Sequence, residues 1–205
     1  MSEISKQVAR VGANSLSIGR GVAGLWLAHE LRTTQPKDRD WVMASKVASL
    51  VITDTIDGKM GRYANPSRLG SWLDQMSDKA FVLPPMITLA NKGEIADYHW
   101  QVKLGRDIGV TALRSVVHLN GGSTAAETLG KMKATAEMTG LVVASSPLAI
   151  EYPELSNKVF ESATILNLAS GAQYMQAFGS FTLAALREQN QEQASLKLAK
   201  QLNAA

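Results

Sequence analysis

The sequence predicts an all-α protein built from six helices. Two observations support this fold class. No segment alternates between apolar and polar residues with a period of two over a useful length, so no β-sheet is expected. Long stretches with few charges are separated by short segments rich in Pro, Gly, Asn, Asp and Ser, which favour turns. Such a pattern is typical of a helical bundle with short connections.

The turn segments divide the chain into its predicted helices. In chain order they are QPKDRD, ANPS, NKGE, NGGS and EYPELSN. In NGGSTAAE, a Ser or Thr can cap the next helix while the Glu lies in its first turn. The predicted helices are 14–32, 41–63, 67–91, 96–119, 126–150 and 156–189. The polar end of the chain is expected to form a frayed or surface helix, so one domain is predicted over 1–190, followed by a tail over 191–205.

Composition and charge exclude several kinds of site and partner. The chain has no cysteine, which rules out disulfides and thiolate-ligated zinc or iron–sulfur centres. The formal net charge is +3, and the Lys and Arg residues are spread along the chain without interleaved aromatic side chains, so no nucleic acid partner is expected. The three histidines, His29, His99 and His118, are far apart in the sequence and form no ligand pattern.

The hydropathy leaves two environments open. Hydrophobic residues make up 45% of the chain and the mean hydropathy is −0.04, which are ordinary values for a soluble protein. Residues 162–186 nevertheless form a run of 25 residues without a charge, long enough to span a bilayer. Most such windows contain Ser, Thr, Asn or Gln. Hydropathy alone therefore fits a soluble helical bundle and a membrane protein equally.

Four aspartates fall in the second and third predicted helices. Asp54 and Asp57 are three residues apart and Asp74 and Asp78 are four apart, so each pair lies on one face of its helix. Neighbouring carboxylates repel each other, and unpaired ones are costly to bury among apolar helices. Divalent cations resolve both problems, and ligands of this kind suit Mg²⁺ or Mn²⁺. The alternative is a solvated acidic face with helix salt bridges.

The residues between the aspartates fit a phosphorylated ligand. A two-metal site commonly neutralises a pyrophosphate while a phosphorus–oxygen bond breaks. Gly58 and Gly70 leave room for a nucleotide to lie against the backbone, and Arg62 can pair with a phosphate through two hydrogen bonds. Together with the aspartates, these residues predict a metal-dependent nucleotide site.

The complete pattern resembles the signature of the CDP-alcohol phosphatidyltransferases, D-x2-D-G-x2-A-R-x7 or 8-G-x3-D-x3-D. Here it reads Asp54-x2-Asp57-Gly58-x2-Gly61-Arg62-x7-Gly70-x3-Asp74-x3-Asp78. Gly61 stands where the family usually has Ala, a change expected to affect helix packing more than chemistry. Because the motif fixes eight positions, chance agreement is very improbable.

Further segments resemble the phosphatidylglycerophosphate synthase branch of the family, in the same order and with similar spacing. Asn14-x2-Ser17-x2-Arg20 is similar to its N-x2-T-x2-R, LDQMSDKAFV to its LDPxxDKxxV, GRDIGVTALR to its A-R-E-x5-L-R, LGKMKATAEM to its G-K-x-K-T-x2-Q-M, and ASGAQYMQAF to its S-G-x2-Y. These matches retain Lys79, Arg106, Arg114, Lys131 and Lys133, with Asp107 in place of Glu.

The resemblance implies a fold, a location and a reaction. The fold is a six-helix membrane bundle, usually a homodimer, whose polar site opens to the cytoplasm between helices. The implied reaction is attack of an alcohol hydroxyl on the β-phosphorus of CDP-diacylglycerol, with release of CMP. The family's metal ligands correspond to Asp54, Asp57 and Asp74, while Asp78 completes the second metal site and corresponds to the proposed general base. The CDP-binding positions correspond to Gly58, Arg62, Gly70, Asn14, Ser17 and Arg20.

The expected acceptor is glycerol 3-phosphate, because cations are available for its phosphate. Arg106 and Arg114 are eight residues apart, roughly two helical turns, and Lys131 and Lys133 begin the next helix. These four cations could instead pair with Asp107, Glu127 and Glu137 or with lipid headgroups. Phosphatidylglycerol, as in cardiolipin synthesis, and inositol phosphate are alternative acceptors.

Charge and hydropathy bear on the expected location. With a cytoplasmic N-terminus, the inner segments carry more Lys and Arg than the outer ones, among which Lys103 and Lys158 are counted. This bias agrees with a multi-pass protein whose active site faces the cytoplasm. The low hydropathy departs from the family, and indicates either a divergent member or a chain altered towards solubility. A soluble, inactive helical analogue is therefore the third alternative.

Overall fold

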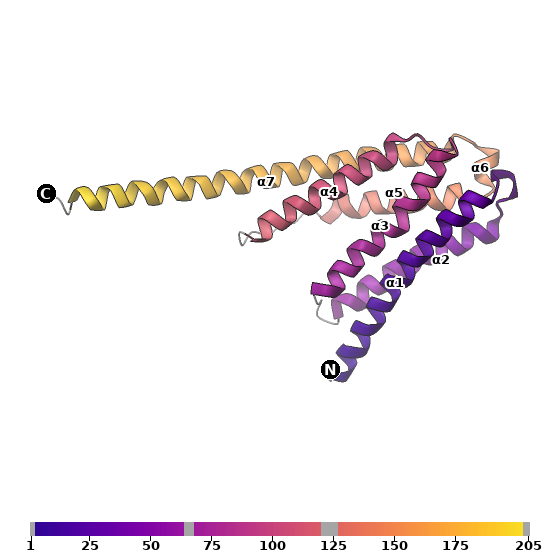
Figure 1. Cartoon of the computed structure of the whole chain (residues 1–205), viewed down its shortest axis with the longest axis horizontal. Helices are drawn as coiled ribbons and strands as arrows, with labels where there is room; N and C mark the ends of the chain where they lie inside the picture. Colours follow the sequence, from indigo (N-terminus) through magenta and orange to yellow (C-terminus); the bar gives the residue numbers. More distant parts are fainter. Residues whose placement is uncertain (1–2, 64–67, 120–126, 203–205) are drawn as a thin grey trace.

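The computed structural model describes residues 3–63, 68–119 and 127–202, which are helical apart from short connections (Figure 1). The helices are α1 (Glu3–Thr33), the 3₁₀ turn η1 (Pro36–Asp38), α2 (Trp41–Tyr63), α3 (Arg68–Asn91), α4 (Tyr98–Leu119), α5 (Glu127–Ala144), α6 (Leu148–Glu151) and α7 (Leu155–Leu202). These ranges contain no strand, which confirms the predicted all-α class.

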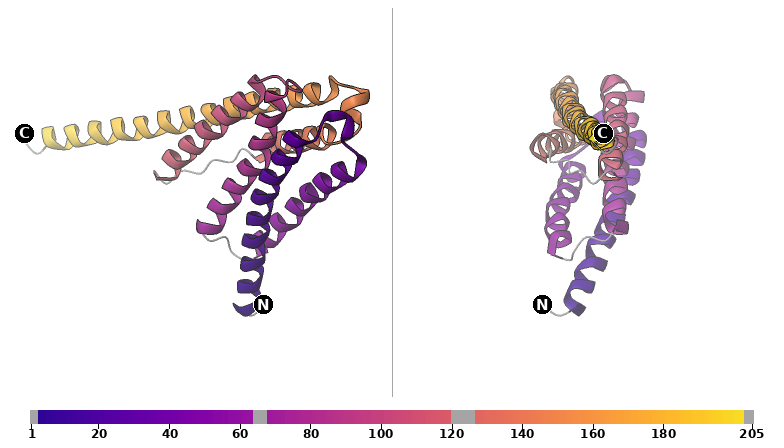
Figure 2. Two further views of the ribbon diagram at one scale, coloured as in Figure 1. Left: turned by 45° about the vertical axis from the view of Figure 1, so that its right-hand side comes forward. Right: turned by 90° about the vertical axis from the view of Figure 1, so that its left-hand side faces the viewer.

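The helices form two groups that meet at one end. α1 packs against α2 and α3, while α7 packs against α4 and α5. The two groups diverge from the end that carries η1 and α6, and α7 continues well beyond its neighbours (Figures 1 and 2). Within the described residues, we find no helix that is both long enough and apolar enough to cross a membrane.

The main hydrophobic core fills the end at which the two groups meet. It joins side chains of α1, α2, α3, α5 and α7 with one from the α3–α4 connection, Ile95. The helical members are Leu27, Leu31, Met43, Val47, Phe81, Val82, Met86, Leu89, Ala90, Met138, Leu141, Ala144 and Phe160. Burial of these apolar side chains is the main force that holds the groups together. A separate contact between Val110 and Tyr174 joins α4 to α7 farther from this end.

Two glycines allow unusually close helix packing. A Cβ atom at Gly24 of α1 would lie 2.2 Å from the carbonyl oxygen of Ala80 and 2.3 Å from the Cα of Phe81, both in α3. A Cβ atom at Gly140 of α5 would lie 2.9 Å from the ring of Phe160 in α7. The contact at Gly24 is with backbone, which cannot rotate away, so only glycine fits at this crossing.

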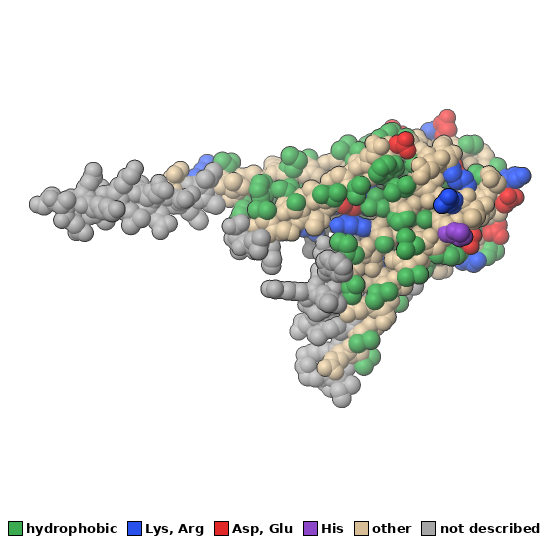
Figure 3. Space-filling model, in the orientation of Figure 1, with side chains coloured by type: hydrophobic (Ala, Val, Ile, Leu, Met, Phe, Trp, Pro, Cys, Tyr) green, Lys and Arg blue, Asp and Glu red, His purple; other side chains and the backbone are tan. Residues whose placement is uncertain are grey.

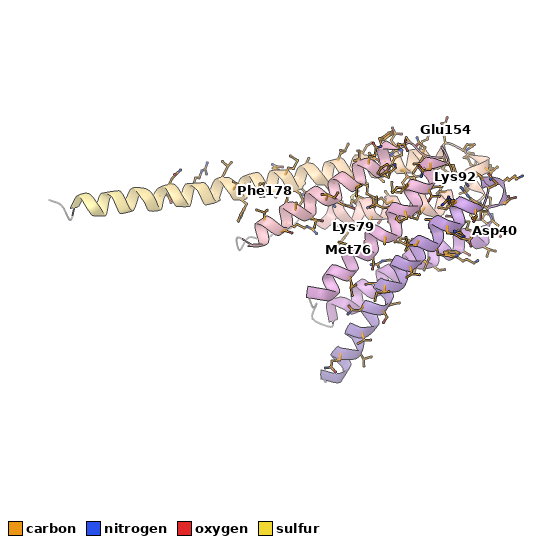
Figure 4. The ribbon with its side chains drawn as sticks, in the orientation of Figure 1. Asp40, Met76, Lys79, Lys92, Glu154 and Phe178 are labelled. Atoms are coloured by element: carbon orange, nitrogen blue, oxygen red, sulfur yellow. The ribbon has the colours of Figure 1, made fainter. Side chains whose placement is uncertain are left out.

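Polar side chains close the connections at the joined end. Both Nη atoms of buried Arg39 donate to the Glu94 carboxylate at 2.5 and 2.7 Å, and Nη1 also donates to the Ala144 carbonyl at 2.8 Å. Lys92, labelled in Figure 4, donates to the carbonyls of Leu31 and Thr34 at 2.8 Å each. These bonds satisfy carbonyl groups that helix ends leave unpaired.

The helix boundaries follow local chemistry, and they depart from the prediction at the start of α1, within 126–150 and at the end of α7. Gly93, at φ 71°, ends α3 in a Schellman motif, in which the amides of Gly93 and Glu94 donate to the carbonyls of Ala90 and Leu89. The predicted helix 126–150 is wrong in its C-terminal part, because α5 ends at Ala144 and α6 is a separate turn. Proline restricts the residue before it, and Ser146 Oγ accepts from the Leu148 amide at 3.3 Å.

Candidate functional site

A cavity of about 340 Å³ lies between α3, α4, α5 and α7, on the side where the two helix groups diverge. Six cations and three carboxylates line it: Lys79, Lys103, Arg106, Arg114, Lys131, Lys133, Asp78, Asp107 and Glu137. Figure 3 shows cationic side chains where α3 approaches α4, in the region in which Figure 4 labels Lys79. The excess of cations favours an anionic ligand.

A buried ionic network forms the floor of this cavity. The Asp107 carboxylate accepts from Lys103 at 3.0 Å, from Arg106 at 3.0 Å and from Lys133 at 3.1 Å. Lys103 also donates to Glu137 at 2.9 Å. The other Glu137 oxygen accepts from the Asn167 amide at 2.7 Å. The network thereby links α4, α5 and α7 through charged groups that are satisfied by one another, as burial requires.

The network shifts the pKa values of Lys103 and Lys133 in opposite directions. Burial alone would lower the pKa of Lys103, but Glu137 and Asp107 raise it above its ordinary value. Burial lowers the pKa of Lys133, and the nearby cations Lys103 and Arg106 act in the same direction against Glu137 and Asp107. Burial would raise the pKa of Asp107, yet Lys103 and Lys133 hold it well below its usual range. Lys103 and Asp107 thus stabilise each other's charged forms.

Two arginines of α4 share one tyrosine of α7. Arg106 donates from Nε to Ser170 at 3.1 Å, and Arg114 donates from Nη2 to the hydroxyl oxygen of Tyr174. The centroid of the Tyr174 ring lies 5.5 Å from Cζ of Arg106 and 4.8 Å from Cζ of Arg114, distances at which cation–π attraction operates. Tyr174 is almost completely buried, with 2% of its surface exposed.

The α3 side of the cavity is tied to α1 and α4. Nη2 of Arg20 lies 2.7 Å from Oδ1 of Asp78, and the Arg20 side chain is buried while that of Asp78 is half exposed. Ser17, three residues before Arg20 and therefore on the same face of α1, is also buried. Lys79 donates to the hydroxyl of Thr111 in α4 at 3.4 Å. These contacts connect the end of the aspartate motif with two neighbouring helices.

Comparison with known proteins identifies the family. The chain matches the sequence profile of CDP-alcohol phosphatidyltransferase over residues 10–175. The chain belongs to the CDP-alcohol phosphatidyltransferase family. It is therefore a transferase of phospholipid synthesis, which confirms the resemblance inferred from the aspartate motif.

Individual relatives of this CDP-alcohol phosphatidyltransferase come from several bacteria. The chain is 33% identical over 138 residues to CDP-diacylglycerol–glycerol-3-phosphate 3-phosphatidyltransferase of Escherichia coli K12. The matched region covers 62% of this chain and 72% of the relative. The Salmonella typhimurium protein of the same description gives the same identity and coverage. A probable phosphatidylglycerophosphate synthase of Mycobacterium tuberculosis H37Rv is 27% identical over 129 residues, or 62% of this chain and 61% of the relative.

Nine of the fifteen predicted site residues of this transferase have described side chains. The cavity brings together Asp78, Lys79 and the four predicted acceptor cations Arg106, Arg114, Lys131 and Lys133. Arg20 joins Asp78, with Ser17 beside it on α1 and half-buried Asn14 one turn earlier. The side chains of Asp54, Asp57, Gly58, Arg62, Gly70 and Asp74 lie outside the described residues.

The predicted Mg²⁺ or Mn²⁺ site rests on the chemistry of its donors. Within the described side chains, no group of three or more acidic or histidine residues could hold a metal ion. Asp78 is the one predicted ligand whose side chain is described. The four predicted donors are all carboxylates, and hard oxygen ligands of this kind fit either cation.

The sequence did not predict the residues that hold the predicted acceptor cations in place. The charge pattern places Lys103 in an outer segment, whereas the structure buries it against Asp107 and Glu137. The spacing Lys103-x3-Asp107 on one helix was a usable signal, because residues four apart share a helix face. No comparable signal pointed to Asn167 or Ser170, which reach the network from α7.

Proposed function

We propose that the chain transfers the phosphatidyl group from CDP-diacylglycerol to glycerol 3-phosphate, giving phosphatidylglycerophosphate and CMP. The observation that carries the proposal is the convergence of Arg106, Arg114, Lys131 and Lys133 on the cavity that Asp78 also lines. A phosphorylated acceptor brings a dianion that needs such cations, whereas an uncharged alcohol does not. The descriptions of the Escherichia coli and Salmonella relatives support the same acceptor.

The distribution of charge in the cavity supports an anionic acceptor. Asp107 and Glu137 are buried and engaged by Lys103, so their charge is largely offset inside the protein. Lys131 and Arg114 are exposed, and Arg106, which is held by Asp107 and Ser170, also lines the cavity. The exposed side of the cavity therefore keeps a positive surplus for a ligand.

The proposed metal-binding residues are Asp54, Asp57, Asp74 and Asp78. When bound, two divalent cations would neutralise the pyrophosphate and stabilise the charge that develops on CMP as it leaves. Gly58 and Gly70 are proposed to admit the CDP moiety against the helix backbone, and Arg62 to pair with its phosphate. Asn14, Ser17 and Arg20 are proposed to complete the CDP site from α1.

Asp78 is proposed as the general base. Its half-exposed carboxylate is oriented by Arg20 and lies at the same cavity as the acceptor cations. From there it can accept the proton of the attacking hydroxyl while the acceptor phosphate is held by α4 and α5 residues. Lys79 adds a cation beside Asp78 and is held towards α4 by Thr111.

The proposed setting is the cytoplasmic face of a lipid bilayer, because the donor carries two acyl chains. We propose a homodimer as the assembled form, as the family resemblance implies. The domain is proposed to span 1–190, with 191–205 as a tail. These features extend the proposal, and none of them is needed for the chemistry at the cavity.

The test is release of CMP with a panel of acceptors. The purified chain is incubated with CDP-diacylglycerol and Mg²⁺ or Mn²⁺, and with glycerol 3-phosphate, glycerol, phosphatidylglycerol or inositol phosphate in turn. CMP release and a product of the mass of phosphatidylglycerophosphate are expected with glycerol 3-phosphate alone. Equal turnover with glycerol, or preferential turnover with phosphatidylglycerol or inositol phosphate, would overturn the proposed acceptor.

A further inference from the structure

Tyr174 occupies a position between two cations that repel each other. Arg106 and Arg114 lie two turns apart on α4, and the ring of Tyr174, from α7, is within 5.5 Å of both guanidinium carbons. Its hydroxyl oxygen also accepts a hydrogen bond from Arg114. Because Tyr174 is 2% exposed, its ring cannot move far without disturbing its contact with Val110.

The two arginines are held to different extents. Arg106 has two further anchors, the Asp107 carboxylate at 3.0 Å and the Ser170 hydroxyl at 3.1 Å. Among the described side chains, Arg114 contacts Tyr174, through the hydroxyl and through the ring face. The orientation of the Arg114 guanidinium relative to Arg106 therefore depends on this tyrosine.

The chemistry of tyrosine suits this task better than that of a carboxylate. An Asp or Glu at this position would fix the two guanidinium groups but would also offset their charge. A phenol and an aromatic face attract cations and carry no net charge of their own when protonated. The arginines are thus held at a fixed separation while both positive charges remain available to an anion in the cavity.

We propose that Tyr174 is a positioning residue that sets the separation and orientation of Arg106 and Arg114 for the phosphate of the acceptor. The inference rests on the proposed function, since it assigns a role at the same cavity. It also gives α7 a part in acceptor selection, although none of the predicted acceptor cations comes from that helix.

The test compares two variants of the full chain. Tyr174→Phe removes the hydroxyl and keeps the ring, and it should raise the KM for glycerol 3-phosphate about two- to tenfold, the effect of one hydrogen bond. Tyr174→Leu removes both contacts and should raise it more than about tenfold. In Tyr174→Phe, kcat and the KM for CDP-diacylglycerol should stay within about twofold of wild type, since the lost hydrogen bond joins Tyr174 to Arg114, a proposed acceptor cation. Tyr152→Phe, an exposed tyrosine at the joined end, is the matched control and should change nothing.

Calorimetric titration with inorganic phosphate separates this inference from the proposed function. Weaker phosphate binding by Tyr174→Phe than by wild type supports the inference, even if wild type does not turn over glycerol 3-phosphate and the acceptor proposal fails. Unchanged phosphate affinity and unchanged KM for glycerol 3-phosphate in Tyr174→Phe would overturn it while leaving the proposed function intact. A fall in Tm with equal rises in both KM values would also overturn it, because Tyr174 would then be a packing residue. A wild-type chain that binds no phosphate would refute it outright.

Discussion

Arg20 of α1 and Asp78 of α3 form an ion pair, with 2.7 Å between Nη2 and Oδ1. The arginine side chain is 2% exposed and the aspartate 53%, so a buried cation orients a carboxylate that reaches the cavity. This pair joins the last aspartate of the family signature to the N-terminal Asn14-x2-Ser17-x2-Arg20 segment. Asp78 therefore has two separable tasks, one in chemistry and one in holding Arg20.

Asp78→Asn separates these tasks, because the amide oxygen can still accept from Arg20. We expect kcat to fall by at least about a hundredfold, the usual scale for loss of a general base. The KM for CDP-diacylglycerol and the Tm should stay near wild type. Asp78→Ala, which also removes the acceptor for Arg20, should lower the Tm. Equal losses of donor binding and turnover in Asp78→Asn would instead make Asp78 mainly a metal ligand.

Asp57→Asn tests the predicted metal site without relying on activity. A metal ion that binds the folded chain raises its Tm, so wild type should show a Tm that increases with Mg²⁺ or Mn²⁺ concentration. The variant should lose this dependence. Asp38→Asn, at an exposed position in η1, should keep it. A metal-dependent Tm of unchanged size in Asp57→Asn would remove Asp57 from the ligand set.

Lys131→Ala is the cleaner test of the acceptor cations. Lys131 is exposed at the cavity, whereas Arg106 and Lys133 also anchor Asp107. We expect a higher KM for glycerol 3-phosphate and an unchanged KM for CDP-diacylglycerol. Arg106→Ala should raise the same KM and also lower the Tm. Lys37→Ala, at the joined end, serves as the control. An equal rise in the KM for glycerol 3-phosphate in this variant would show that the effect comes from the net charge of the chain and not from the cavity.

Gly24→Ala tests the close crossing of α1 and α3. Its Cβ atom would overlap the backbone of Ala80 and Phe81, so the helices must separate and the free energy of unfolding should fall. Gly19→Ala on the same helix meets no atom within 4 Å and should raise stability by up to about 1 kcal/mol through helix propensity. Urea unfolding of both variants measures the contrast. Equal free energies of unfolding for the two variants would show that α1 and α3 have room for a methyl group at Gly24, against the 2.2 Å distance to the Ala80 carbonyl oxygen.

His99 should make stability depend on pH. It is fully buried, with Nε2 3.1 Å from the Asn157 side-chain oxygen and Nδ1 2.7 Å from the Thr164 hydroxyl, and burial lowers its pKa below 6.5. The unfolded chain therefore takes up a proton more readily, and the free energy of unfolding should fall as the pH drops below 6.5. Unfolding at pH 7.5 and 5.5 should show a smaller loss in His99→Gln than in wild type. Exposed His29→Gln should behave as wild type.

The sequence predicted the helical class and most of the helix boundaries, because these depend on local signals. Gly93 marks the end of α3, and the start of α2 follows Asp40, whose carboxylate accepts from the Met43 amide at 2.8 Å. The break after Ala144 was not predicted because Ser145, Ser146 and Pro147 lie in a run without charges that fits a helix. α1 begins before the predicted start at residue 14, and α7 continues through the stretch predicted as a frayed or surface helix, since polar residues weaken the apolar pattern in both segments.

The sequence predicted the site residues that belong to recognisable motifs, but not the residues that pair with them in space. Family resemblance named Arg106, Arg114, Lys131 and Lys133, and the structure gathers them at one cavity, while their roles stay a prediction. The partners of these residues could not be found in this way. Lys103 and Glu137 are 34 residues apart, and no local pattern says that one neutralises the other.

The proposed donor-binding and acceptor-binding residues occupy separate parts of the chain. Every proposed metal-binding and CDP-binding residue precedes Lys79 in the chain. Every proposed acceptor cation follows Tyr98, as does the positioning residue Tyr174. Under the proposed assignment, donor and acceptor recognition are encoded in two consecutive stretches of the gene that meet across the α3–α4 connection. Recombination at that single junction could exchange the acceptor while inheriting the nucleotide chemistry unchanged.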